Sequence, residues 1–148
     1  MGLPYENSTS GKNAIADIQK ILQGFGASSF GYMEQFDTDE LLVQFDWNGR
    51  KVQLKASARG YAAAWLKHHP YSTRSRGNRS DHEAKALKQG KIAVYSILRD
   101  WVKGQVTAIE TGMLTFEGAF LGQLLLDDNT TVLEKFHSQL SLPAPVDE

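Results

Sequence analysis

Seven basic side chains in the middle of the chain have the types and spacing to bind phosphate. Three arginines lie in the short polar stretch 71–79, and four more cations follow on one predicted helix. Guanidinium groups pair with phosphate oxygens, and a helix N-terminus itself attracts anions. The candidate phosphate-binding residues are Arg74, Arg76, Arg79, Lys85, Lys88, Arg99 and Lys103. The alternative is a solvated basic face that neutralises acidic residues elsewhere in the fold.

Four rings near the arginines could add stacking or hydrogen bonds to a bound base, namely His68, His69, Tyr71 and His82. His82-Glu83 begins like the helical HExxH zinc motif, but position 86 is alanine, so the second histidine is missing. The chain also has no cysteine. We therefore predict no metal site and no cofactor.

A weak metal-dependent nuclease is the one enzymatic hypothesis that we keep. Restriction-endonuclease-like cores hold a divalent metal with an acid on one strand and an acid-x-Lys pattern on the next. Here Gln53-Leu54-Lys55 has glutamine where the acid is needed, and Gln44 stands opposite it in the predicted sheet. The chain has no nucleophile elbow and no glycine-rich nucleotide loop. We expect no catalytic residues.

The elements that must position these side chains begin with a hairpin around Asn48-Gly49. This pair favours a type I′ turn, because both of its central positions need positive φ. A two-residue loop places Trp47 opposite Arg50, and the same register pairs Phe45 with Val52. One face of the hairpin is then apolar and the other mostly polar, as a half-buried antiparallel sheet requires.

A long amphipathic helix is predicted over residues 80–111. Ser80 with Glu83 forms a capping-box pattern at its start, and Gly112 favours a left-handed turn at its end. Small residues along one edge predict the close approach of another backbone, either a helix of this chain, which we favour, or a second copy. They are Ala86, Gly90, Ala93, Gly104 and Ala108.

The overall prediction is an α+β fold, in which an N-terminal α-β-β-β-α unit with a three-stranded antiparallel sheet precedes the long helix and two shorter helices. The other predicted elements are a helix over 10–23, a strand over 28–36, a helix over 58–68, and short helices capped by Thr115 and by Thr130 or Thr131. We predict one domain over residues 10–141, with flexible ends at 1–9 and 142–148.

The charge distribution is strongly uneven along the 148 residues. The segment from Arg50 to Lys103 holds 13 of the 16 Lys and Arg residues and 3 of the 17 Asp and Glu residues, so it carries +10 and the rest carries −11. A basic block of this kind suits a phosphate-rich partner.

No apolar run is long enough to span a bilayer, and the first residues lack a secretory signal pattern. We expect a cytosolic protein without a membrane partner.

Several short stretches resemble a family of small proteins encoded by bacteriophages and prophages. The similarity covers roughly residues 40–136. Its stretches are ARGYAAAWL (58–66), HEAKAL (82–87), ILRDWVKGQVTAIE (97–110), Phe116-Glu117 with Phe120-Leu121, and TVLE (131–134). This family has no assigned activity, so the resemblance implies a phage origin and the bacterial host cytosol but no site residues.

The leading hypothesis is a non-catalytic, phage-encoded binder of nucleic acid or of a nucleotide or polyphosphate ligand. The second is a protein-interaction module that inhibits a host defence or transcription protein, and the nuclease is the third. A homodimer is a further possibility.

Overall fold

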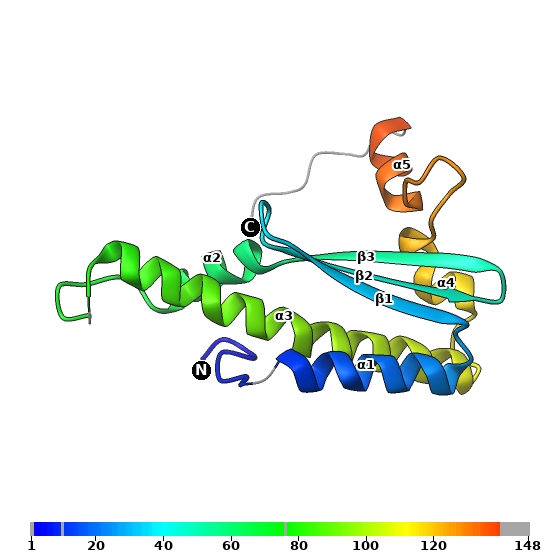
Figure 1. Ribbon diagram of the computed structural model, residues 1–148, viewed down its shortest axis with the longest axis horizontal. Coiled ribbons are helices and arrows are strands. Elements are labelled where there is room, and N and C mark those ends of the chain that lie inside the picture. Colours follow the sequence, from blue (N-terminus) through cyan, green and yellow to red (C-terminus); the bar gives the residue numbers. More distant parts are fainter. Residues whose placement is uncertain (1, 10, 76, 140–148) are drawn as a thin grey trace.

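The protein consists of a three-stranded antiparallel sheet with helices packed along one face, as Figure 1 shows. The structure is a computed structural model, and it describes residues 2–9, 11–75 and 77–139. The elements are α1 (Gly11–Phe25), β1 (Ser29–Gln35), β2 (Glu40–Trp47), β3 (Arg50–Ser57), α2 (Ala58–His68), α3 (Arg79–Glu110), α4 (Phe116–Phe120), the 3-10 helix η1 (Leu121–Gln123) and α5 (Val132–Gln139). The predicted α+β fold is confirmed.

The hairpin has the predicted turn and register. Asn48 and Gly49 have φ angles of 50° and 78°, and Trp47 pairs with Arg50. β1 adds to the other side of β2, which gives the order β1-β2-β3. Alternate residues of β2 are buried against the helices, because successive side chains of a strand point to opposite faces.

The core lies between the sheet and the pair formed by α1 and α3. Its largest fully buried side chains are Phe45, Phe120, Ile18, Leu22, Val43, Val52 and Val102. Aromatic rings close the end near the hairpin turn: Trp47 stacks on Phe116 with centroids 4.4 Å apart, and Phe25 stacks on Trp47 at 5.0 Å. Burial of such rings contributes to the stability of the fold.

The start of α3 differs slightly from the prediction. Asn78, not Ser80, caps the helix: its side chain accepts from the backbone N–H of Asp81 at 2.8 Å, and the Asp81 carboxylate accepts from the N–H of Asn78 at 3.2 Å. The sequence contains two overlapping capping-box patterns, and the earlier one forms. Gly112 follows the helix with φ 78°, as predicted.

The small-residue edge of α3 divides into two parts. A Cβ on Gly90 would lie 2.5 Å from the backbone oxygen of Ala58 in α2, so the intrachain partner favoured by the sequence is confirmed for this part. Ala86 is fully buried in the same contact. Gly104 is exposed, and a Cβ there would meet nothing within 4 Å.

The chain after α3 covers the free edge of β3. Thr115 caps α4 as predicted, and the pair Leu124–Val52 forms an isolated antiparallel bridge. Thr131 starts α5, because its hydroxyl accepts from the N–H of Glu134 at 3.2 Å. The predicted tail 142–148 and the end of the predicted domain, residues 140–141, lie outside the described residues.

Candidate phosphate-binding surface

The end of the molecule formed by α2, the following loop and the first turns of α3 carries a group of exposed cations. This end extends past the sheet on the left of Figure 1. We call it the basic end, and its described cations are Lys67, Arg74, Arg79, Lys85 and Lys88, all exposed. None of the ion pairs within the described residues involves any of these five side chains. Arg76 lies outside the described residues.

An aromatic cluster supports the basic end. The His69 ring stacks on Trp65 with centroids 4.2 Å apart, and the His82 ring lies 5.2 Å from Trp65 and 5.7 Å from Tyr71. A hydrogen bond of 2.5 Å joins His82 Nε2 to the backbone oxygen of His69. Trp65 is only 6% exposed, so its ring is not open for a base to stack on.

Two of the cations lie over rings of this cluster. The Arg79 guanidinium lies 5.3 Å from the centre of the Tyr71 ring, and Lys85 Nζ lies 6.0 Å from that of Trp65. Cation–π contacts of this kind fix the positive groups without neutralising their charge. The charge therefore remains available to an anion from solvent.

The structure brings together three of the four rings predicted for stacking. His69, Tyr71 and His82 belong to the aromatic cluster, whereas His68 is exposed at the end of α2. The residues predicted from the sequence did not include Trp65 or Lys67. The signal that could have found both is their place in the last turns of α2, next to the basic loop.

The N-terminus of α3 is occupied by the protein's own carboxylate. Asp81 accepts the backbone N–H of Asn78, as described above, so the expected anion site at this helix end already holds a negative group. Because the Asp81 charge opposes a second anion there, we expect a phosphate at the basic end to be bound mainly by side chains.

Residues 2–9 lie across α2 and α3 beside the cluster. Tyr61 donates its hydroxyl to the backbone oxygen of Pro4 at 2.6 Å, and Glu6 lies 3.1 Å from His69 Nε2. Tyr5 donates to Asp100 at 2.5 Å, a bond that raises the pKa of Tyr5 and lowers the pKa of Asp100. The predicted flexibility of this segment stays a prediction.

Arg99 and Lys103 lie far from the basic end. Twenty residues of helix separate Arg79 from Arg99, a distance of about 30 Å. Arg99 Nε donates to Asp100 at 3.0 Å, and its guanidinium also lies 3.9 Å from Asp17, so the neighbouring carboxylates raise the pKa of Arg99. The seven predicted residues thus do not form one continuous surface, and Arg99 is paired with acids.

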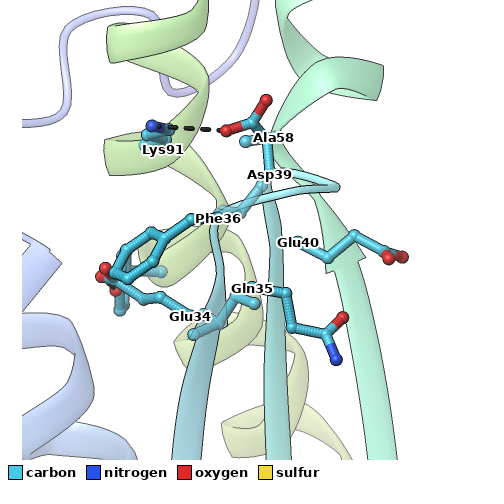
Figure 2. A pocket seen from close by; sticks show the side chains of 10 residues that line it. Glu34, Gln35, Phe36, Asp39, Glu40, Ala58 and Lys91 are labelled. Atoms are coloured by element: carbon cyan, nitrogen blue, oxygen red, sulfur yellow. Dashed lines mark hydrogen bonds and ion pairs between the residues drawn. The ribbon is translucent and has the colours of Figure 1, made fainter.

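Lys91, which lies between these groups on α3, is also paired. Figure 2 shows Lys91 extending toward Asp39, at a distance of 3.4 Å, above a small cavity of about 40 Å³. Arg59 binds the same carboxylate at 2.8 Å, and this contact is the main reason why the pKa of Asp39 is lowered. A cavity of this size holds one or two waters and is too small for a nucleotide.

The region of the nuclease hypothesis lacks a metal-binding arrangement. Gln53 donates to Gln44 at 3.2 Å, and Lys51 lies 4.0 Å from Asp46. Across residues 2–9, 11–75 and 77–139, no three His, Asp or Glu side chains are grouped as metal ligands. The same ranges contain no helix long and apolar enough to cross a membrane.

Comparison of the chain with models of protein families, with curated proteins and with solved structures found no match.

Proposed function

We propose that the basic end binds the phosphates of a nucleic acid or another polyphosphate, and that the protein is a non-catalytic, phage-encoded binder acting in the host cytosol. The observation that carries this proposal is the set of five exposed cations without acidic partners in the described chain. Cations held close together in this way repel one another, and a polyanion relieves that repulsion while releasing its own counterions.

The arrangement favours contacts with phosphate over contacts with bases. Tyr71 has the Arg79 guanidinium over its ring, and Trp65 is buried between His69 and Lys85. Side chains that contact only phosphates bind different sequences about equally. We therefore expect little sequence preference, and the resemblance to phage-encoded proteins makes phage DNA and RNA the first ligands to test.

The competing hypothesis of a host-protein inhibitor relied on the acidic flanks of the chain and on the apolar edge of the long helix. Much of that apolar edge is used within the fold, because Val94, Leu98 and Val102 are buried. The five cations of the basic end form no ion pairs within the described residues, so phosphate binding is the better supported function.

The test is fluorescence anisotropy with labelled single-stranded DNA, RNA, duplex DNA and inorganic polyphosphate over a range of salt concentrations. We expect binding at low salt that weakens steeply as salt rises. In the double variant Arg74→Glu with Arg79→Glu, the slope of log affinity against log salt should fall by about 1.5, because each lost phosphate contact removes about 0.7–0.9.

The matched control is Lys12→Glu with Lys55→Glu. These two exposed lysines also lack ion pairs in the described residues, they lie on α1 and β3, and their reversal changes the net charge by the same amount. This control should keep most of the affinity. Equal losses in both double variants, or no binding by the wild type at low salt, would contradict the proposal.

A further inference from the structure

The outer edge of β1 has no backbone partner within the described residues. β1 pairs only with β2, and none of the backbone hydrogen bonds outside the elements involves residues 29–35. The opposite edge of the sheet is treated differently: Leu125 donates its backbone N–H to the Lys51 oxygen at 2.8 Å, and Leu124 bridges to Val52. One edge of the sheet is thus covered and the other is open.

Large apolar side chains are concentrated along this open edge. Tyr32 is 53% exposed, Met33 58% and Phe36 80%. Tyr32 and Met33 are adjacent, so they project from opposite faces of the strand. Soluble proteins usually protect an open edge with lysine, proline or a bulge, and residues 27–36 contain no Lys, Arg or Pro.

We propose that β1 pairs with β1 of a second copy, antiparallel and about a two-fold axis through Tyr32, so that the two sheets join into one. In this register Met33 lies opposite Gly31 of the second copy. A Cβ on Gly31 would meet nothing within 4 Å, so the space beside it is open to the methionine side chain. Tyr32 lies next to its own copy on the axis.

The charges on the strand favour a second copy as the occupant. The one charged side chain of β1 is Glu34, which accepts a hydrogen bond from the Tyr95 hydroxyl of α3. In the proposed register Glu34 lies opposite Phe30, and the two Glu34 side chains are four residues apart along the pair, about 13 Å. A nearly neutral strand therefore meets an equally neutral one, and no like charges face each other.

The size of the contact predicts a weak, reversible dimer. The exposed parts of Tyr32, Met33 and Phe36 amount to roughly 400 Å² per copy, or about 800 Å² in total, which is below the range of stable interfaces and fits a weak, transient one. Two-fold pairing of identical strands is isologous and closes after two copies, so it does not extend into fibres. Because β1 contributes nothing to the basic end, this inference stands or falls separately from the proposed function.

The decisive test uses Tyr32→Cys in the full chain, which has no natural cysteine. Residues directly opposite each other in an antiparallel pair have Cα atoms about 4.5–5.5 Å apart, within the range of a disulfide. Mild oxidation should therefore cross-link most of this variant as a dimer on a non-reducing gel. Gln35→Cys serves as the register control, since its two copies would lie about 20 Å apart, and Ser138→Cys on α5 serves as the control for random collisions.

Cross-linking of Tyr32→Cys no greater than that of Ser138→Cys would overturn the proposal, and preferential cross-linking of Gln35→Cys would overturn the pairing.

A second measurement does not depend on cysteine. Sedimentation of the wild type should show concentration-dependent dimerisation, and Met33→Lys, which places a charge on the edge, should abolish it. Leu133→Lys, at an exposed apolar position on α5, should leave it unchanged. A wild type that stays monomeric at every concentration would also count as refutation.

Discussion

The cations of this protein fall into two groups that differ in what surrounds them. Outside the basic end, several cations lie against carboxylates: Arg59 and Lys91 share Asp39, and Arg50 lies 2.8 Å from Glu117. At the basic end, Arg79 and Lys85 lie over rings and Arg74 is exposed, and none of the three forms an ion pair within the described residues. Arginine and lysine thus form ion pairs within the fold in one region, and in the other region their charge remains available to an anion from solvent.

This difference bears on the two interpretations of the basic segment. In sequence, the positive charge between Arg50 and Lys103 is one block, and either internal neutralisation or an external anion could balance it. In space, acids from outside that block, such as Asp17 and Asp39, reach only part of it. Internal neutralisation accounts for one group of cations, whereas the cations of the basic end have no acidic partner in the described residues.

The largest predicted effect comes from separating α2 from α3, the two helices that form the basic end. Gly90→Ala adds a Cβ 2.5 Å from the Ala58 backbone oxygen, and backbone cannot move aside as a flexible side chain can. We expect the free energy of unfolding to fall by about 2–3 kcal/mol, although alanine favours helix more than glycine does. Urea denaturation followed by circular dichroism measures this change.

The same substitution further along α3 should have the opposite sign. Gly104 is exposed and has open space around its Cβ position, so Gly104→Ala gains helix propensity without a steric cost. We expect the free energy of unfolding to rise by up to about 1 kcal/mol in the same assay. If both variants changed stability in the same direction, the assignment of close α2–α3 packing at Gly90 would be wrong.

The features that could be predicted from the sequence are those set by neighbouring residues. Asn48-Gly49 fixes both the turn and the register of β2 against β3, because a two-residue loop leaves one way to pair the strands. The bounds of α2 were also predicted correctly, since Pro70 prevents the helix from continuing. Thr115 as a cap and Gly112 as a terminator depend on equally local chemistry.

The features that could not be predicted depend on residues far apart in the chain. Arg99 meets Asp17 across 82 positions, and Asp39 meets Lys91 across 52. Helical spacing places Lys85 and Arg99 on one long helix but gives no information about which acids another helix brings to them. The gathering of Trp65, His69 and His82 likewise depends on how the loop returns α3 beside α2.

A smaller effect on stability is expected from Asp39→Asn, because Asp39 is the carboxylate that Arg59 and Lys91 share. Asparagine keeps the shape and tolerates the positive φ of 54° at this position, but it removes the charge that Arg59 and Lys91 share. Because the folded state lowers the pKa of Asp39 below the ordinary value of 3.8, its contribution to stability is present above that value and is lost as the pH falls through the folded pKa.

The wild type should therefore be more stable than Asp39→Asn at neutral pH, and the difference should shrink as the pH falls below about 4. Urea denaturation at a series of pH values measures both curves. A constant difference across the acid range would show that the carboxylate charge does not stabilise this end. Asp100 and Asp128, whose pKa values are also lowered by their hydrogen bonds, should still give Asp39→Asn some acid sensitivity.

The smallest effect on stability is expected at the basic end. Arg74 is exposed and has no ion pair in the described residues, so Arg74→Gln should change the free energy of unfolding by no more than about 0.5 kcal/mol. Arg59→Gln, which breaks a 2.8 Å contact with Asp39, is the matched comparison and should cost more. Polyanion affinity should follow the reverse order, falling in Arg74→Gln and not in Arg59→Gln. Stability and polyanion binding would then depend on different cations. If Arg74→Gln were as unstable as Arg59→Gln, the two groups of cations would not differ in their contribution to stability.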